Sequence, residues 1–410
     1  MSKVLIDGRF IGVGDSISRV TLGLLGQFLK LDKENQYSLL IRPAGVRVLK
    51  EFGFWDREDL RIEVLDIPHY SVAEQTKLFI WLNKKPYDLV FFTQFNHPIR
   101  YRKPFVVAIH DMTTFGYFHY QNPAKVAVFK AVMRSAVKNS KKILTPSENS
   151  KKEIIDHYKI DSKKIKVMYL GIYENYLRIS KLGVAEKKRL GEKFKKEYKI
   201  SGDYFLYTGM WKKHKNLVRM LKAFEQVVKS EKSKVKSSRI QLVLVGKIDQ
   251  NEPEVIAEIE RINYKIQDTR YNNQKNSKLQ IPNYKLGNSN YPIIAVGFVP
   301  EEFLPAAYAG ALAYVQPSLN EGFGWPPLEA MACGTPVIAS NVSATPEILG
   351  DAALYFDPYN ENDIAKKMSL IVDDFKLRLD LQKKGLEQIK NYSWQKTAEI
   401  ALKVINEVLK

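Results

Sequence analysis

The sequence has a single cysteine, Cys333, among its 410 residues. One cysteine cannot form an internal disulfide, and no cysteine pair with metal-binding spacing is present, so a disulfide framework is excluded and a reducing compartment is favoured. The chain also lacks a run of ~18–20 apolar residues, which a membrane-spanning helix requires. Its N-terminus has no basic segment followed by a long apolar one, so we expect no signal peptide. Together these absences predict a cytoplasmic protein.

Acidic residues are outnumbered, because 64 Lys and Arg stand against 45 Asp and Glu and give a formal net charge of +19. Such an excess favours a polyanionic partner, such as nucleic acid, anionic lipid head groups or phosphorylated substrates. No RNA-recognition, KH, zinc-finger or basic-zipper signature accompanies the charge, so we expect no nucleic-acid partner. A lysine-rich solvated surface explains the charge equally well, since lysine side chains are almost never fully buried.

The length and the order of apolar segments indicate two domains. A chain of 410 residues is longer than one hydrophobic core usually serves, and 45% hydrophobic residues are typical of a folded chain. Short apolar runs alternate with amphipathic stretches twice along the sequence, which predicts two parallel sheets flanked by helices. The expected strands of the first half are residues 4–6, 37–41, 62–65, 89–92, 105–109, 142–145 and 165–167. Those of the second half are residues 204–207, 240–245, 293–296, 311–316, 336–339 and 353–356.

Changes in composition suggest where the domains meet. The expected parts are a first domain at residues 1–175, a charged linker at 176–200, a second domain at 201–390, and a C-terminal helix at 391–410. Ser393 is the expected N-cap of that helix. Two polar insertions, residues 230–238 and 267–292, interrupt the second domain. The longer one is unusual for a compact domain, and the sequence leaves its role open.

Residues 320–336 read NEGFGWPPLEAMACGTP and hold two glutamates around a Gly-Trp-Pro-Pro stretch. Proline is tolerated only in the first turn of a helix, so we expect a helix from Leu328, with Glu329 in its first turn and Glu321 in the loop before it. The loop follows an expected strand, at the edge of a parallel sheet where ligands bind. A helix N-terminus also favours an anionic group such as phosphate. In the simpler alternative, Glu329 complements the helix dipole and Glu321 is solvated.

The spacing of Glu321 and Glu329, with Gly-Phe-Gly and Pro-Pro-Leu-Glu-Ala around them, closely resembles the E-x7-E element of family 4 retaining glycosyltransferases. Other stretches resemble the same family in the expected order, so the resemblance covers nearly the whole chain. They are His110-Asp111, TPSENSKKEI at 145–154, MYLGI at 168–172, YTGMWKKHKNL at 207–217, and the segments on either side of residues 320–336. Within the family these features resemble mannosyltransferases of surface polysaccharide synthesis.

The resemblance implies the GT-B fold, in which two Rossmann-like domains face a cleft and a C-terminal helix crosses back to the first domain. It implies a nucleotide-diphosphate sugar donor, such as GDP-mannose or a UDP-sugar, and a glycan or lipid-linked acceptor. It also implies retention of configuration, for which we favour front-face substitution over a covalent intermediate on Glu321. No Asp-x-Asp motif follows an expected first-domain strand, so we expect neither a metal nor another cofactor.

The resemblance also implies roles for individual residues. Glu321 would contact the donor sugar, Glu329 the ribose hydroxyls, and Lys215 the diphosphate, whose charge grows as the sugar leaves. His110 would reach a sugar hydroxyl, although a structural histidine at a strand end is the alternative. The expected catalytic residues are Glu321, His110 and Lys215. The expected donor-binding residues are Glu329, Phe323, Gly324, Gly209, His214, Leu328 and Gly246, and the expected acceptor or phosphate loop contains Gly12, Gly14 and Arg19.

Two loops depart from the family pattern. His214 stands where the family often has arginine, and a neutral imidazole holds an anion more weakly than a charged one. Met210 stands where some members place a second arginine, for which Lys212 and Lys213 could compensate. The first loop reads GVGDSISR instead of the commoner Gly-Ile-Gly-Arg-Tyr, so Arg19 is either its basic residue or a surface residue.

Residues 125–142 carry apolar side chains at helical spacing with basic ones between them. Packing on the first domain's sheet explains this pattern. A basic rim on anionic lipids at the inner face of the membrane is a second reading, which would link the net charge to a lipid-linked acceptor.

Two other functions stay open at this point. One is a polyanion-binding protein on an inactive GT-B scaffold, against which the intact Glu321, Glu329, Lys215 and His110 argue. The other is a GT-B enzyme of another kind, either a sugar-nucleotide epimerase or a phosphorylase. The phosphorylase is disfavoured because it would need a cofactor lysine and a much longer chain.

Overall fold

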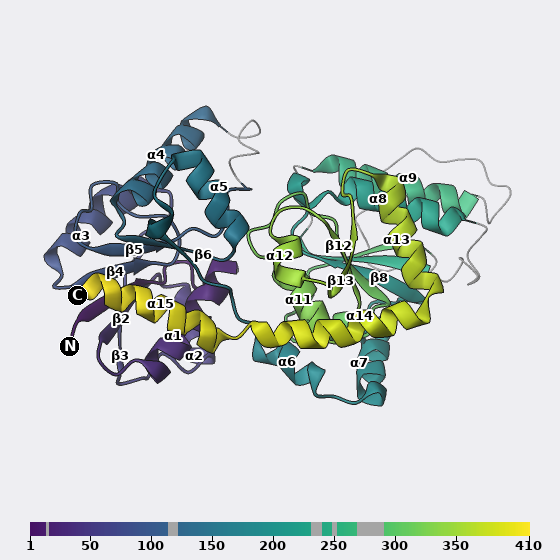
Figure 1. The fold of residues 1–410 in the computed structure, drawn as a ribbon, viewed down its shortest axis with the longest axis horizontal. Helices are drawn as coiled ribbons and strands as arrows, with labels where there is room; N and C mark the ends of the chain where they lie inside the picture. The colour runs from purple at the N-terminus through teal and green to yellow at the C-terminus, as the bar shows by residue number, and fades with distance from the viewer. Residues whose placement is uncertain (14–15, 114–121, 231–239, 248–251, 269–290) are drawn as a thin grey trace. The chain divides into compact units, whose positions relative to one another are not determined.

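The computed structural model describes residues 1–13, 16–113, 122–230, 240–247, 252–268 and 291–410. These residues form two compact units, each built around its own parallel sheet (Figure 1). The first unit contains residues 1–171 and 392–410, and the second contains residues 172–391. The expected α/β fold with two doubly wound sheets is confirmed. The insertions expected at 230–238 and 267–292 fall almost entirely outside the described residues.

The first unit is built on a seven-stranded sheet with the order β3-β2-β1-β4-β5-β6-β7, and all of its pairings are parallel. Central strands such as β4 and β5 are buried along their whole length, as expected where helices cover a parallel sheet. The strands are β1 (Lys3–Asp7), β2 (Gln36–Ile41), β3 (Leu60–Val64), β4 (Leu89–Phe92), β5 (Phe105–Ala108), β6 (Lys142–Thr145) and β7 (Ile165–Val167). The helices are α1 (Ser16–Leu31), α2 (Gly45–Glu51), η1 (Glu74–Leu78), α3 (Phe79–Lys84), α4 (Pro123–Asn139), α5 (Glu148–Tyr158), η3 (Ser162–Lys164) and α15 (Trp394–Leu409).

The second unit repeats the arrangement with a six-stranded parallel sheet of order β10-β9-β8-β11-β12-β13. Its core lies between the sheet and the apolar faces of helices such as α8 and α13. The strands are β8 (Asp203–Thr208), β9 (Ile240–Val245), β10 (Ile293–Gly297), β11 (Ala313–Gln316), β12 (Val337–Ser340) and β13 (Ala353–Phe356). The helices are α6 (Glu174–Ser180), α7 (Val184–Glu197), η4 (Lys213–Lys215), α8 (Leu217–Lys229), α9 (Pro253–Asp268), α10 (Leu304–Ala309), α11 (Trp325–Ala332), α12 (Thr345–Leu349), α13 (Glu361–Asp373), α14 (Phe375–Gln388) and η6 (Ile389–Asn391).

Strand order reverses once in each sheet, beside the first strand of that unit. In the first unit β1 lies between β2 and β4, and in the second unit β8 lies between β9 and β11. Ligands of open α/β sheets bind at the carboxyl ends of the strands that flank such a reversal. The loops after β1 and β4, and those after β8 and β11, are therefore where a site is expected.

The segment expected as a linker, residues 176–200, is part of the second unit instead. It forms most of α6 and α7, which bury Tyr176 and Phe194. The ring of Tyr176 lies 5.9 Å from that of Tyr308, measured between centroids. The many lysines of this segment obscured its amphipathic pattern, because their charged heads lie in solvent while one apolar face packs on the unit.

The C-terminal helix α15 returns to the first unit, as expected for this fold. Ser393 is its N-cap and accepts a hydrogen bond from the backbone N–H of Lys396 at 3.2 Å, which confirms the capping prediction. The helix packs on α1, and the buried Thr397 hydroxyl donates to the backbone oxygen of Tyr169 at 2.8 Å.

Candidate functional site

The candidate site of the second unit lies where β8 and β11 end side by side. The loop after β8 runs through η4 to Asn216, and the loop after β11 runs from Pro317 to α11. The two loops are tied together by the backbone bond from the N–H of Leu319 to the oxygen of His214 at 2.8 Å. The Asn216 amide also donates to the oxygen of Pro317 at 3.1 Å. The site is therefore a pre-organised pair of loops at the reversal of the sheet.

Lys215 and Glu321 form an ion pair across these loops. The ammonium of Lys215 lies 2.7 Å from Oε1 of Glu321, and the two side chains are 20% and 12% exposed. Burial acts to raise the pKa of Glu321, but the charge and hydrogen bond of Lys215 outweigh burial and hold the pKa below its ordinary value. The carboxylate is therefore ionised at neutral pH, and a ligand can still reach both groups.

The loop of Lys215 leads directly into α8, whose first-turn N–H groups carry the positive end of the helix dipole. Asn216 sits at the N-cap with a φ of 58° and turns the chain into the helix. An ammonium beside a helix N-terminus is a suitable place for a phosphate group. This is the chemistry that the resemblance implied for Lys215.

His214 does not replace the missing arginine as a cation. Burial, with Lys215 and Lys212 nearby, lowers the pKa of the imidazole to about 4, against the opposing effect of Glu321. The ring is therefore neutral at physiological pH. Lys212 and Lys213, considered as substitutes, are exposed and line a cavity of about 330 Å³ that also contains Arg219.

Helix α11 begins at Trp325, three residues before the expected start at Leu328. Pro326 and Pro327 are accommodated in the first turn, where backbone N–H groups have no partner within the helix. Glu329 consequently lies in the second turn and not in the first, which removes the helix-dipole explanation for it. Its side chain is only 3% exposed, and Oε2 accepts a hydrogen bond from the Tyr308 hydroxyl at 2.9 Å.

Three other residues predicted to bind the sugar donor lie at or near the start of α11. Gly324 is the N-cap of α11, and Phe323 is buried with its ring centroid 6.2 Å from that of Trp325. Leu328 is wholly buried, so it can offer a ligand only backbone atoms.

Gly209 and Gly246 follow β8 and β9 and lie against each other. A Cβ on Gly246 would stand 1.9 Å from the backbone oxygen of Gly209, which no other residue could tolerate. This close approach of two backbones explains Gly246 without any ligand. A contact of either glycine with a nucleotide stays a prediction.

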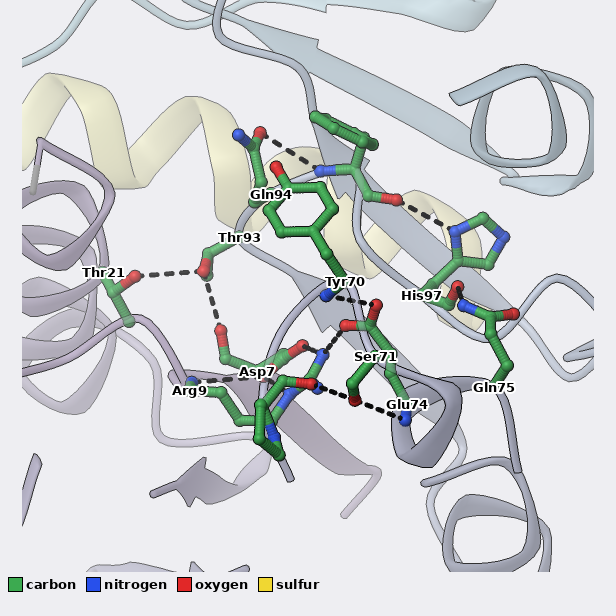
Figure 2. Close-up of polar contacts among 12 residues, drawn as sticks. Asp7, Arg9, Thr21, Tyr70, Ser71, Glu74, Gln75, Thr93, Gln94 and His97 are labelled. Carbon is green, nitrogen blue, oxygen red and sulfur yellow. Dashed lines mark hydrogen bonds and ion pairs between the residues drawn. The ribbon is translucent and has the colours of Figure 1, made fainter. Parts of the chain in front are cut away.

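The first unit has a buried ionic cluster at its own strand-order reversal (Figure 2), and sequence reasoning missed it. Arg9, two residues after β1, donates through Nε and Nη2 to the carboxylate of Asp7 at 2.9 and 2.8 Å. The same Nη2 atom lies 2.9 Å from Oε1 of Glu74 in η1. Asp-Gly-Arg directly after an apolar strand was the available signal.

Burial lowers the pKa of Arg9, but Asp7 and Glu74 outweigh it, so the guanidinium remains charged. Burial, opposed by Arg9 and aided by Asp7, raises the pKa of Glu74. The loop after β4 joins this cluster through Thr93, whose hydroxyl donates to the backbone oxygen of Asp7 at 2.7 Å (Figure 2). Because these charges are covered, the cluster holds loops in place and offers no accessible charge.

The predicted residues of the first unit surround the same edge of its sheet. His110 follows β5, and its Nε2 lies 2.9 Å from the backbone oxygen of Thr93. Gly12 has a φ of +87°, and a Cβ there would lie 2.4 Å from the oxygen of Ala44, so glycine is required. Arg19 is partly buried in α1. Gly14 lies outside the described residues.

Within the described ranges, no three His, Cys, Asp or Glu side chains gather into an arrangement that could hold a metal ion. Metal independence stays a prediction.

Two family models match the chain, one in each part. A model described as Glycosyltransferase Family 4 matches residues 47–175, and one described as Glycosyl transferases group 1 matches residues 191–388.

The chain is similar to the O-antigen chain mannosyltransferase B of Escherichia coli, with 29% identity over 71% of this chain and 67% of that protein. It is 26% identical to the serotype-specific mannosyltransferase WbdA of Escherichia coli over 65% of this chain, which amounts to 29% of that longer protein. The structure of Anabaena Alr3699/HepE in complex with UDP-glucose superimposes with a TM-score of 0.71 at 14% identity, over 99% of this chain and all of that one. At that identity the likeness shows the fold alone. The chain therefore contains a Glycosyltransferase Family 4 domain followed by a Glycosyl transferases group 1 domain, and it is a glycosyltransferase with the GT-B fold.

Proposed function

We propose that this enzyme transfers a mannosyl residue from a nucleotide-diphosphate sugar to a glycan acceptor, with retention of configuration. The observation that carries the proposal is the accessible Lys215–Glu321 pair beside the N-terminus of α8. The names of the relatives, both mannosyltransferases, favour mannose as the sugar. GDP-mannose is accordingly the first donor to test, with UDP-sugars next.

In the proposed complex, Lys215 and the first turn of α8 bind the donor diphosphate and stabilise the charge that develops as the sugar leaves. Glu321, placed 2.7 Å from Lys215, lies beside the reacting sugar. Glu329 binds the ribose hydroxyls, because a carboxylate accepts two hydrogen bonds from a diol. The first unit recognises the acceptor, with His110, Gly12 and Arg19 as candidate contacts.

We propose front-face substitution as the chemical step. The acceptor oxygen forms a bond to the anomeric carbon while the bond from that carbon to the phosphate oxygen breaks. The acceptor proton passes to the departing phosphate oxygen, so the enzyme needs to supply positioning and charge stabilisation only. Neither a metal nor a separate base is required by this proposal.

The decisive experiment is a donor panel containing GDP-mannose, UDP-glucose and UDP-N-acetylglucosamine, read by thermal shift and by release of the nucleoside diphosphate. Stabilisation and turnover with one donor are expected, and NMR of the product from an α-linked donor should show an α-linkage. A β-linked product would contradict retention. Tight nucleic-acid binding without a response to any donor would contradict the enzyme proposal and favour a polyanion-binding protein.

We also propose that the enzyme acts in the cytoplasm and binds the membrane surface peripherally. No helix among the described residues has the length and apolar character needed to cross a bilayer. The first half of α4 is exposed, with Val128 52% exposed between Lys125 and Lys130. Exposed apolar and basic residues on one helix suit an anionic lipid surface.

Sedimentation with vesicles of anionic and of neutral lipid tests the membrane proposal. Binding only to anionic vesicles at physiological salt is expected, and Lys125→Glu combined with Lys130→Glu should weaken it. Equal changes at Lys376 and Lys383 on α14 of the second unit are the control. Absence of salt-sensitive binding would contradict the proposal.

A further inference from the structure

Gln316, the last residue of β11, holds the carboxylate of Glu321 from inside the second unit. Its side-chain nitrogen Nε2 donates to Oε1 of Glu321 at 2.5 Å, and it also lies 3.0 Å from the hydroxyl oxygen of Ser318. Gln316 is only 2% exposed, so this contact is shielded from water. The same carboxylate oxygen lies 2.7 Å from the ammonium of Lys215, whose side chain is 20% exposed.

The orientation of the Gln316 amide is determined by its neighbours. Its oxygen Oε1 accepts a hydrogen bond from the hydroxyl of Tyr314 at 2.8 Å. A carboxylate can only accept, so the nitrogen end of the amide has to face Glu321 and the oxygen end has to face the tyrosine. Burial raises the pKa of Tyr314 well above its ordinary value, so the phenol keeps its proton at neutral pH.

Glu329 is held in an equivalent way by Tyr308. The Tyr308 hydroxyl donates its single proton to Oε2 of Glu329 at 2.9 Å, so Thr208, 2.7 Å away, has to donate to Tyr308. The Tyr314 hydroxyl also lies 3.4 Å from the backbone oxygen of Thr208, but its single proton is donated to Gln316 at the shorter distance. Two buried hydrogen-bonded sets therefore support the site, one in which Tyr314 donates to Gln316 and Gln316 to Glu321, and one in which Thr208 donates to Tyr308 and Tyr308 to Glu329.

We propose that Gln316 and Tyr308 are positioning residues for the two site glutamates, an inference that rests on the proposed function. Lys215 cannot neutralise a donor diphosphate and hold Glu321 equally tightly, because both anions compete for one ammonium. When Lys215 turns to the diphosphate, Gln316 keeps Glu321 in place for the transfer step. Tyr308 keeps Glu329 in the orientation that binds the nucleotide.

The kinetic test separates the two positions. Gln316→Met keeps a similar side-chain volume but removes the N–H group that donates to Glu321. Because a hydrogen bond to a charged group is worth ~1.5–3 kcal/mol, kcat should fall about tenfold or more. The KM for the sugar donor should change little. Tyr308→Phe should raise the donor KM about tenfold, with a smaller change in kcat. The loss of the Gln316 hydrogen bond favours the protonated carboxyl of Glu321, so the acidic limb of the kcat profile should move to higher pH.

Two matched control variants lose comparable buried hydrogen bonds that involve neither Glu321 nor Glu329. Gln241→Met removes a buried amide that accepts from the N–H of Ser201 at 2.9 Å, and Tyr204→Phe removes a buried hydroxyl that donates to the oxygen of Ala307 at 2.6 Å. Both should lower Tm by amounts similar to the test variants and leave the kinetic constants and the pH profile unchanged.

The outcomes distinguish this inference from the proposed function. Wild-type turnover together with a Gln316→Met variant that matches Gln241→Met in kcat and pH profile would overturn the positioning role alone. Absence of wild-type turnover with every donor would overturn the proposed function. A crystal structure of Gln316→Met combined with Lys215→Met, compared with that of Lys215→Met alone, needs no sugar donor and decides the positioning role in either case, because Lys215 would otherwise hold the Glu321 carboxylate. A displaced Glu321 carboxylate is expected, and an unmoved one would overturn the inference.

Discussion

The two units place charged residues at the same topological position and use them differently. At the reversal of the first sheet, the Arg9 side chain is 0% exposed and is shared by Asp7 and Glu74, whereas at the reversal of the second sheet Lys215 and Glu321 form a single pair that a ligand can reach. A covered ion cluster fixes loops, and its desolvation has to be balanced by its partners. An accessible pair can exchange one partner for a substrate. The exposure of the charged side chains therefore indicates that the first cluster has a structural role and that the second pair is available to bind a substrate.

The largest effect is expected at the accessible pair. Lys215→Ala should lower kcat/KM by about 10²–10³, the range seen when one group that stabilises transition-state charge is removed. Steady-state kinetics and thermal unfolding measure the effect, and Tm should fall less than in Arg9→Leu, because the pair is partly exposed. Lys213→Ala, an exposed residue of the same η4 turn, is the matched control. A large loss of Tm with normal kinetics in Lys215→Ala would show that the Lys215–Glu321 pair is structural and would contradict its proposed role in catalysis.

The two glutamates of the second site should respond differently from each other. Glu329→Ala should mainly weaken donor binding, by about 10–100-fold, because charge-assisted hydrogen bonds to the ribose are lost. Glu321→Ala should mainly lower turnover. Calorimetry with the nucleoside diphosphate and kinetics with the donor measure the two constants. Equal and mild effects of both changes on both constants would contradict this division.

The covered cluster should respond in stability and not in donor binding. Arg9→Leu should lower the free energy of unfolding by about 3–5 kcal/mol, because two buried carboxylates lose their partner. Denaturant unfolding measures it, with the exposed Arg42–Asp66 pair as control, where Arg42→Leu should cost under about 1 kcal/mol. An unchanged stability of Arg9→Leu would show that the cluster is not structural.

The smallest effect is a difference in pH dependence between the two carboxylates. The pKa of Glu321 is lowered on folding, so its contribution to stability is present at neutral pH and is lost as the pH falls through its folded pKa. The pKa of Glu74 is raised, so the protonated form is favoured in the fold and wild-type stability falls as the pH rises through that pKa.

Unfolding free energies of Glu321→Gln and Glu74→Gln, measured between pH 3 and 7, test this difference. Relative to wild type, Glu321→Gln should become less stable as the pH rises, and Glu74→Gln should become more stable. Parallel pH trends in the two variants would contradict the contrast.

Much of the fold was predictable because it depends on local patterns. Short apolar runs predicted the thirteen strands that the described residues form in the two sheets, and Ser393 was recognised as an N-cap from its own side chain. The linker at 176–200 was predicted wrongly, because abundant lysines concealed the face that buries Tyr176 and Phe194. The start of α11 was predicted three residues late, because the first turn of a helix accommodates both prolines.

The candidate site was predictable only as a set of residue types. Glu321, Glu329 and Lys215 could be named from motif spacing, but the sequence did not show which side chains hold them. Gln316 and Tyr308 lie in the segment before residues 320–336, but the sequence assigned them no role, because their importance arises from side-chain contacts that form only in the folded unit.

The sequence by itself determined the class of fold, the family and the identity of the charged residues in the second site, because these depend on periodicity and on short motifs. Only the tertiary structure decided which charges are covered and which are accessible. It placed Arg9 between two carboxylates, made His214 neutral through burial and neighbouring lysines, and gave Glu321 and Glu329 buried hydrogen-bond donors in Gln316 and Tyr308. Burial and pKa depend on what the rest of the chain packs against a side chain, which no local stretch of sequence specifies.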